Sequence, residues 1–193
     1  MQLPETRDGG EIVKQIYIVR HCKASGQDRS ASLTDEGIRQ SEELADFFYD
    51  KNIEYIISSP FERAISSVLP FSNRMRIEIH IEDRLRERVL SSIDLIDWMD
   101  QLKETFQDLD LKLPGGESSQ EAMNRGVDVI KELLEQEEKN IIVVTHGNLM
   151  SLILKYFDRS IGFDDWRALS NPDVFKLQKS EKTGEIIIKR MWK

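Results

Sequence analysis

Short apolar runs alternate with longer amphipathic stretches along this chain. The runs at residues 16–19, 54–58 and 140–145 are rich in β-branched side chains, as is typical of buried strands. Residues 76–82 alternate polar and apolar side chains, which predicts another strand that is covered on one face. Because helical stretches separate these strands, the pattern predicts an α/β fold with a mostly parallel sheet.

Amphipathic helices are predicted between the strands. Residues 35–51 open with acidic side chains and carry an apolar stripe. The stripe consists of Ile38, Leu44, Ala45 and Phe48. Residues 91–106 and 118–139 also have helical character, and the loop "LPGGE" lies between them.

Two of the helices have recognisable start signals. Ser59, Pro60 and Glu62 have the spacing of an N-cap, a first helical position and the acidic partner of a capping box. Ser118 and Glu121 repeat the capping-box spacing later in the chain. We therefore expect helices to begin at these two points.

The two ends of the chain differ in character. Residues 174–192 predict a hairpin with Thr183 and Gly184 in its turn, antiparallel at the edge of the sheet. Such an edge can pair with a second copy of the chain, so a homodimer is one state that the sequence allows. Residues 1–10 contain little that can pack and predict a loose lead-in to a single domain over 11–193.

Composition narrows the classes of partner. Lys and Arg total 27 against 35 for Asp and Glu, a net charge of −8, which argues against binding to nucleic acid or anionic membranes. Any anion site must then be a local arginine cluster. A single cysteine, no signal sequence and no long apolar run predict a cytoplasmic protein without a membrane span.

Four polar side chains stand at the ends of predicted strands or just beyond them. Arg20 and His21 follow the first strand, and Arg63 lies in the first turns of the helix after the second strand. His146 comes directly after the strand at 140–145. The carboxyl ends of parallel strands line the ligand crevice of such a sheet. We therefore expect these four residues to meet at one edge.

Either His21 or Cys22 could be the nucleophile of that site. Six residues separate Cys22 from Arg29, one more than a cysteine-based phosphate loop allows, and no helix start follows to lower the thiol pKa. A neutral imidazole can accept a phosphoryl group while two arginines hold its oxygens. The residues favour His21 as nucleophile, Arg20 and Arg63 as the phosphate clamp, and His146 as a further donor.

Six short motifs, read in order, resemble those of the histidine phosphatase superfamily, whose fold is phosphoglycerate mutase-like. They are "VRHCKAS", "LTDEG", "SSPFERA", "LRER", "PGGES" and "VTHGN", and they span about 130 residues. The resemblance implies a three-layer α/β/α fold with a mixed, mostly parallel sheet. It also implies a phosphohistidine on His21, a phosphate pocket from Arg20, Arg63 and His146, and Glu87 as general acid and base.

The chain departs from the family pattern at Cys22, where glycine is usual. Substrate contacts are predicted from Lys23 and Ser25, which follow this position, and from Gly147 and Asn148, where a helix start can offer a backbone N–H to phosphate. The Trp-Asn pair of the mutase branch is missing, which favours a metal-independent phosphatase without a cofactor over a phosphoglycerate-type mutase. A non-catalytic protein that binds phosphate ligands is the third reading.

Several side chains have plainer interpretations. His80 is expected to be an ordinary strand residue, and Arg84, Arg86 and Arg88 are either a solvated run or a second anion site. The histidines and the cysteine lack metal-ligand spacing. Trp98, Met99, Phe106, Phe157 and Trp166 are expected in core or lid packing. Residues after Arg88 through about Ser119, which include Trp98 and Phe106, are expected to supply the variable part of the pocket. The expected partner is a small phosphomonoester with an apolar portion.

Overall fold

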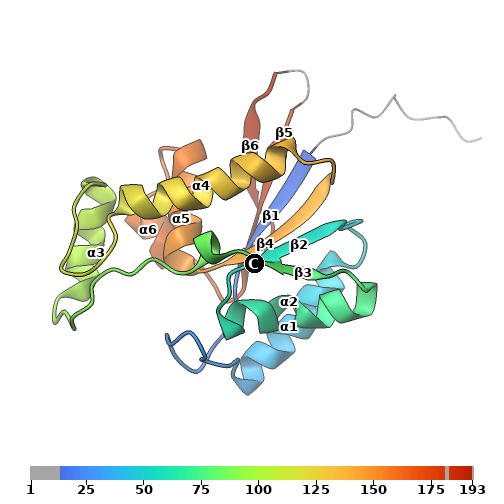
Figure 1. Ribbon diagram of the computed structural model, residues 1–193, viewed down its shortest axis with the longest axis horizontal. Helices are drawn as coiled ribbons and strands as arrows, with labels where there is room; N and C mark the ends of the chain where they lie inside the picture. The colour runs from blue at the N-terminus through green and yellow to red at the C-terminus, as the bar shows by residue number, and fades with distance from the viewer. Residues whose placement is uncertain (1–13, 181–182, 193) are drawn as a thin grey trace, which may run out of the picture.

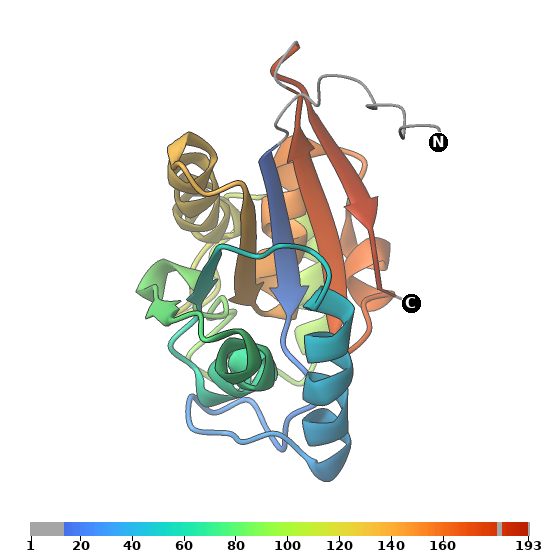
Figure 2. The same ribbon diagram turned by 90° about the vertical axis from the view of Figure 1, so that its right-hand side faces the viewer.

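The computed structural model describes residues 14–180 and 183–192, which build one mixed six-stranded sheet in the order β3-β2-β4-β1-β5-β6. The strands are β1 (Lys14–Arg20), β2 (Tyr55–Ser58), β3 (Ile79–Ile81), β4 (Asn140–Thr145), β5 (Asp173–Lys179) and β6 (Ile186–Arg190). β1 pairs parallel with β4, and β2 pairs parallel with both β3 and β4. β5 and β6 are antiparallel and form the edge beyond β1 (Figure 2).

Helices cover both faces of this sheet. They are α1 (Asp35–Phe48), α2 (Glu62–Met75), α3 (Trp98–Gln107), α4 (Ser119–Glu135), α5 (Gly147–Phe157) and α6 (Phe163–Arg167). α1 and α2 lie on one face and α4 and α5 on the other, while α3 and α6 extend the second layer (Figure 1). The predicted three-layer α/β/α fold with a mixed, mostly parallel sheet is confirmed.

The alternation of side chains in β1 separates two cores. Ile16 and Ile18 pack in the cluster that includes α4 and α5, whereas Tyr17 and Val19 pack in the cluster that includes α1 and α2. Successive residues of a strand point to opposite faces, so a buried central strand must be apolar at every position. This explains why the run at 16–19 shows no polar alternation.

The helix start predicted at Ser59 and Pro60 is wrong, because α2 begins at Glu62. The backbone N–H of Ser59 donates to the carbonyl of Val144 at 2.9 Å, which continues the pairing of β2 with β4 beyond the strand end. Its hydroxyl lies 2.7 Å from Nε2 of His146 and accepts the backbone N–H of Phe61 at 3.3 Å, but the N-cap of α2 is Phe61. Sheet pairing and a contact across the site therefore override the local capping signal.

The helix predicted over 91–106 begins only at Trp98. Ser92 donates its backbone N–H to the carbonyl of Pro114 at 2.9 Å, and the Ser91 hydroxyl donates to the same oxygen at 3.1 Å. These contacts tie the segment to the loop before α4. Hydrogen bonds of this kind, from a serine hydroxyl or a backbone N–H to another loop, compete with the hydrogen bonds of a helix.

Two smaller predictions also change. The strand predicted over 76–82 is only three residues long, because Arg76 ends α2 in the left-handed conformation with φ of 57°. Ile38 is 54% exposed and so lies outside the buried stripe of α1. Gly37 takes the inward position instead, where a Cβ would lie 2.0 Å from the carbonyl oxygen of Lys23.

Other predictions are confirmed. Ser118 and Glu121 form the reciprocal capping box of α4, and β5 and β6 are the antiparallel edge strands expected of the hairpin, with Gly184 at φ 68° after the turn. The lead-in predicted for residues 1–10 lies outside the described residues. In the part of the chain that the structure describes, no helix has the length and apolar character needed to cross a bilayer.

Candidate active site

His21 stands directly beyond β1 and has one defined tautomer. Its Nδ1 lies 2.7 Å from the backbone carbonyl of Cys22, and a carbonyl can only accept, so Nδ1 carries the hydrogen. Nε2 then holds the lone pair, and it accepts a hydrogen bond of 3.2 Å from Nε of Arg63. Asn171 fixes the backbone here by donating its side-chain amide to the His21 carbonyl.

The environment keeps this imidazole neutral. Burial lowers the pKa of His21 to about 4, the positive charges of Arg63 and Arg20 act in the same direction, and the bond to Cys22 only partly opposes them. At neutral pH, Nε2 is therefore an unprotonated nitrogen. Such a nitrogen can act as a nucleophile.

Two arginines flank His21. Arg63, from the first turn of α2, is 1% exposed and also donates to the carbonyls of Gln27 and Asp28, at 3.0 and 2.7 Å. Arg20, the last residue of β1, donates through Nη1 to the carbonyl of Leu169 at 3.1 Å, and its buried Nε has no partner. Burial lowers the pKa of both guanidinium groups, while the charge of Glu87 opposes that change.

His146 is the N-cap residue of α5 and is fully buried. Its ring centre lies 5.1 Å from that of His21, and its Nε2 contacts the Ser59 hydroxyl. Nδ1 is buried without a partner. Burial lowers the pKa of His146 well below its usual value, and the neighbouring charges of His21 and Arg63 add to that effect. The ring is therefore neutral and can offer a hydrogen bond.

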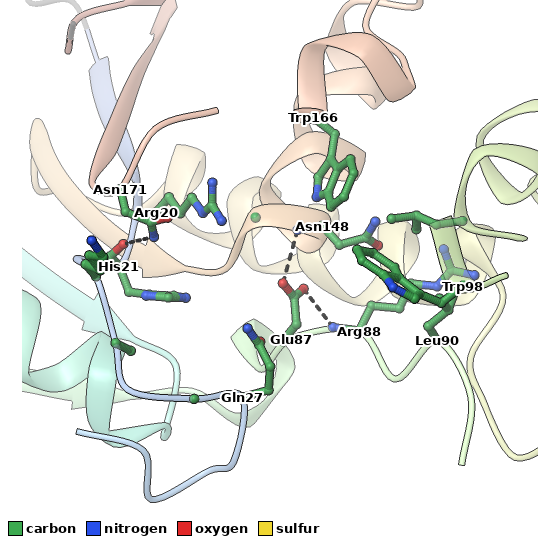
Figure 3. Close-up of a pocket in the computed structure, with 15 residues that line it drawn as sticks. Arg20, His21, Gln27, Glu87, Arg88, Leu90, Trp98, Asn148, Trp166 and Asn171 are labelled. Carbon is green, nitrogen blue, oxygen red and sulfur yellow. Dashed lines mark hydrogen bonds between the residues drawn. The ribbon is translucent and has the colours of Figure 1, made fainter. Parts of the chain in front are cut away.

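Glu87 is held by three backbone N–H groups. Asn148 and Leu149, in the first turn of α5, donate to its two carboxylate oxygens at 3.1 and 3.0 Å, and Arg88 donates its N–H at 2.9 Å (Figure 3). The N-terminus of a helix favours a negative charge, so this carboxylate completes α5. The predicted use of the Asn148 N–H is therefore corrected, because that group serves Glu87 and does not face an open phosphate site.

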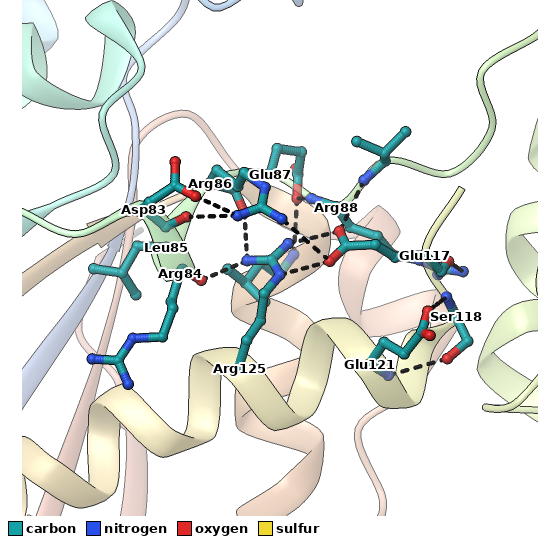
Figure 4. A network of polar contacts seen from close by, with 12 residues as sticks. Asp83, Arg84, Leu85, Arg86, Glu87, Arg88, Glu117, Ser118, Glu121 and Arg125 are labelled. Atoms are coloured by element: carbon teal, nitrogen blue, oxygen red, sulfur yellow. Dashed lines mark hydrogen bonds and ion pairs between the residues drawn. The ribbon is translucent and has the colours of Figure 1, made fainter. Parts of the chain in front are cut away.

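A partly buried ion pair between Arg125 and Glu117 holds the segment that carries Glu87. Arg125, on α4, donates Nη1 to the carbonyls of Arg84 and Arg86, and donates Nε and Nη2 to the Glu117 carboxylate at 2.8 and 2.9 Å (Figure 4). Glu117 accepts the backbone N–H of Val89 at 3.3 Å. The chain is thus held on both sides of Glu87.

The run Arg84, Arg86 and Arg88 divides into two kinds. Arg84 pairs with Glu82 and Glu132 at the surface, and Arg86 pairs with Asp83, as the solvated interpretation predicted. Arg88 is only 6% exposed and donates to Thr105, Ser119 and the carbonyl of Glu117. Burial lowers its pKa to about 10.

A pocket of about 500 Å³ opens in front of His21. Of the residues predicted from the sequence, Arg20, His21, Lys23, Glu87, Gly147 and Asn148 line it. Arg63 and His146 are not among the lining residues, but both contact His21, which is. Ser25 instead donates its hydroxyl to the carbonyl of Ser32 and is not among the lining residues.

Other residues that line the pocket are Ala24, Gly26, Gln27, Arg88, Leu90, Trp98, Leu102, Trp166 and Asn171. Leu90, Trp98 and Leu102 lie between Arg88 and Ser119, where the sequence predicts the variable part of the pocket. Trp166 is expected only in packing, and no sequence signal marks Asn171. Among the described residues, no three His, Cys, Asp or Glu side chains gather as a metal site would require.

Cys22 faces away from this pocket and is fully buried in the cluster beneath α1 and α2. Its backbone N–H donates to the Ser67 hydroxyl at 2.7 Å. Burial raises the pKa of the thiol to about 12, so the thiolate is scarce at neutral pH. The geometry therefore favours His21 over Cys22, as the loop spacing predicted.

Comparison with known proteins places this arrangement in a family. The family model described as "Histidine phosphatase superfamily (branch 1)" matches residues 16–187. The chain belongs to the histidine phosphatase superfamily. The resemblance noted in the sequence is thereby confirmed, and with it, at the level of the family, the prediction of a phosphatase-type enzyme.

Relatives within the superfamily are phosphatases by name. "Putative phosphoserine phosphatase 2" of Hydrogenobacter thermophilus is 25% identical over 158 residues, which cover 74% of this chain and 77% of that protein. A mycobacterial glucosyl-3-phosphoglycerate phosphatase superposes with a TM-score of 0.73 at 19% identity, covering 93% of this chain and 98% of that one. A phosphoserine phosphatase of Entamoeba histolytica, solved with 3-phosphoglyceric acid, gives 0.71 at 17%, covering 93% and 97%. The two structures support the fold.

Proposed function

We propose that this member of the superfamily is a metal-independent phosphomonoester hydrolase that works through a phosphohistidine on His21. The observation that carries the proposal is the state of that imidazole: its hydrogen is fixed on Nδ1, its unprotonated Nε2 accepts from Arg63, and His21 lines a pocket together with Arg20. The named phosphatases among its relatives support a small phosphorylated metabolite as the substrate class.

In the first half-reaction, Nε2 of His21 attacks phosphorus while the bond from phosphorus to the ester oxygen breaks. Arg63, which donates its Nε–H to Nε2, turns that N–H to a phosphoryl oxygen, and the unpartnered Nε of Arg20 donates to another. Nδ1 of His146 offers a further donor where negative charge grows. Protonated Glu87 gives its proton to the departing alkoxide, so the alcohol leaves neutral.

In the second half-reaction, Glu87 takes a proton from water as the oxygen attacks phosphorus. The nitrogen–phosphorus bond breaks, the electron pair returns to Nε2, and inorganic phosphate departs. Glu87 ends protonated, ready for the next ester. A positioned acid and base of this kind typically contributes about 10²- to 10⁴-fold.

The test is to trap the intermediate. Brief reaction with a labelled phosphomonoester, quenched in base, should leave an acid-labile phosphoryl group on the protein. His21→Ala should abolish both the trapped label and turnover, while Cys22→Ala, one position along the chain, should retain both. A variant with His21→Ala that still hydrolyses the ester would overturn the proposal, and release of an isomerised ester in place of phosphate would favour a mutase.

A further inference from the structure

The end of the pocket away from His21 is built from apolar side chains. Trp98 comes from the start of α3 and Trp166 from α6, and Leu90 and Leu102 complete this wall. In Figure 3, both indoles lie on the far side of Glu87 from His21. A phosphate held at His21 would therefore direct its alcohol towards these rings.

The two indoles form a corner. Their ring centres are 6.4 Å apart and their planes meet at 88°, so the edge of one ring meets the face of the other. Trp98 remains 46% exposed, which leaves apolar ring surface open to the solvent. A flat apolar group seated in this corner would contact both indoles and remove that surface from water.

Asn148 supplies a polar edge beside the corner. Its residue is 8% exposed, and both polar atoms of its side chain, Nδ2 and Oδ1, are buried without a partner. It lines the same pocket, and Figure 3 shows its amide between Glu87 and the indoles. A buried amide without partners is costly, so a ligand that both donates and accepts a hydrogen bond would satisfy it.

The charged groups at this end are engaged elsewhere. Arg88 directs its guanidinium to Glu117, Thr105 and Ser119. Lys23, which also lines the pocket, is paired with Glu36. The surroundings of the indole corner therefore favour a neutral group over a second carboxylate or phosphate.

From these contacts we propose that Trp98, Trp166 and Asn148 form the leaving-group subsite. The subsite accepts an alcohol that carries a planar apolar ring with a neutral donor–acceptor group, such as a carboxamide. The inference rests on the proposed function, because the hydrolysed ester supplies this alcohol. It goes beyond that function by naming the kind of alcohol that the ester carries.

Binding and turnover test the subsite separately. 3-Phenylpropylphosphonate and butylphosphonate mimic two primary alkyl phosphates and cannot be hydrolysed, so calorimetry measures binding whether or not the protein turns over. We expect the phenyl compound to bind about tenfold more tightly, as stacking on one or two aromatic rings allows. Trp98→Ala and Trp166→Ala should each reduce this ratio to about twofold or less, and Tyr49→Ala, at an exposed tyrosine on α1, should preserve it.

A para-carboxamide on the phenyl ring tests Asn148. It should improve binding by about threefold to tenfold over a para-methyl group, and Asn148→Leu should remove that advantage. Equal binding of phenyl and alkyl phosphonates, or tighter binding of phosphoserine than of either, would overturn the subsite. If the preferences hold but no ester is hydrolysed and no phosphohistidine forms, the proposed function fails while the subsite stands.

Discussion

Arg125 offers a test of how the fold positions Glu87. The Arg125→Met variant keeps an unbranched side chain of similar length but loses four hydrogen bonds, two to carbonyls beside Glu87 and two to Glu117. Burial alone would raise the pKa of the Glu117 carboxylate, and the hydrogen bond and charge of Arg125 now lower that pKa instead. The variant leaves this carboxylate without that partner. The perturbation therefore loosens the segment without touching the pocket.

The structure sets the size of the stability effect. Removing one partner of a fully buried ion pair costs about 3–5 kcal/mol. The side chains of Arg125 and Glu117 remain 12% and 19% exposed, so we expect a smaller loss, about 2–3 kcal/mol. For a chain of this size that corresponds to a melting temperature lower by roughly 4–12 °C.

The activity effect depends on the leaving group. Misplacing Glu87 removes part of general acid catalysis, so kcat/KM for an alkyl phosphate should fall by about 10- to 100-fold. p-Nitrophenyl phosphate releases a stable phenolate that needs no proton, so kcat/KM for this ester should fall by less than about threefold. Because kcat/KM covers only the steps through phosphoryl transfer to His21, the comparison isolates the acid role of Glu87.

Arg84→Met is the matched control. Arg84 makes surface ion pairs, and its loss should cost less than about 1 kcal/mol and change both substrates little. An Arg125→Met protein that unfolds cooperatively but loses activity equally with both esters, or loses none, would refute the positioning argument.

Two further predictions concern the phosphate end of the site. Gly147→Ala would place a methyl group 3.1 Å from Nε of Arg20 and displace the guanidinium, so KM and the inhibition constant of inorganic phosphate should rise by roughly tenfold. Gly162 has open space around it, so Gly162→Ala should change neither constant. Equal effects of the two variants would contradict the steric argument. Because burial and the neighbouring arginines lower the pKa of His21 to about 4, its ring should stay neutral as the pH falls past 6.5 and gain a proton only near pH 4 in an NMR titration. Unfolded His21 binds that proton first, so the contribution of His21 to the free energy of unfolding should fall by about 1.4 kcal/mol for each unit by which the pH is lowered between 6.5 and 4. A midpoint near 6.5 in the titration would disprove the desolvated state.

The chain alone determined the fold class and most of the candidate catalytic group. Strand and helix periodicity are local properties, and their alternation restricts the sheet to a mainly parallel topology. Since that topology gathers the carboxyl ends of strands, Arg20, His21, Arg63 and His146 could be placed together before any contact was known. Glu87 was reached through the family motif, because no periodicity marks a residue in a loop.

Only the tertiary structure decided how those groups are held. Ser59 has the local signature of a helix cap, yet its backbone N–H continues the pairing of β2 with β4 and its hydroxyl contacts His146. Glu87 takes its place from the amides of Asn148 and Leu149, about sixty positions away in the chain. Such contacts join segments distant in sequence, so local propensity carries no record of them.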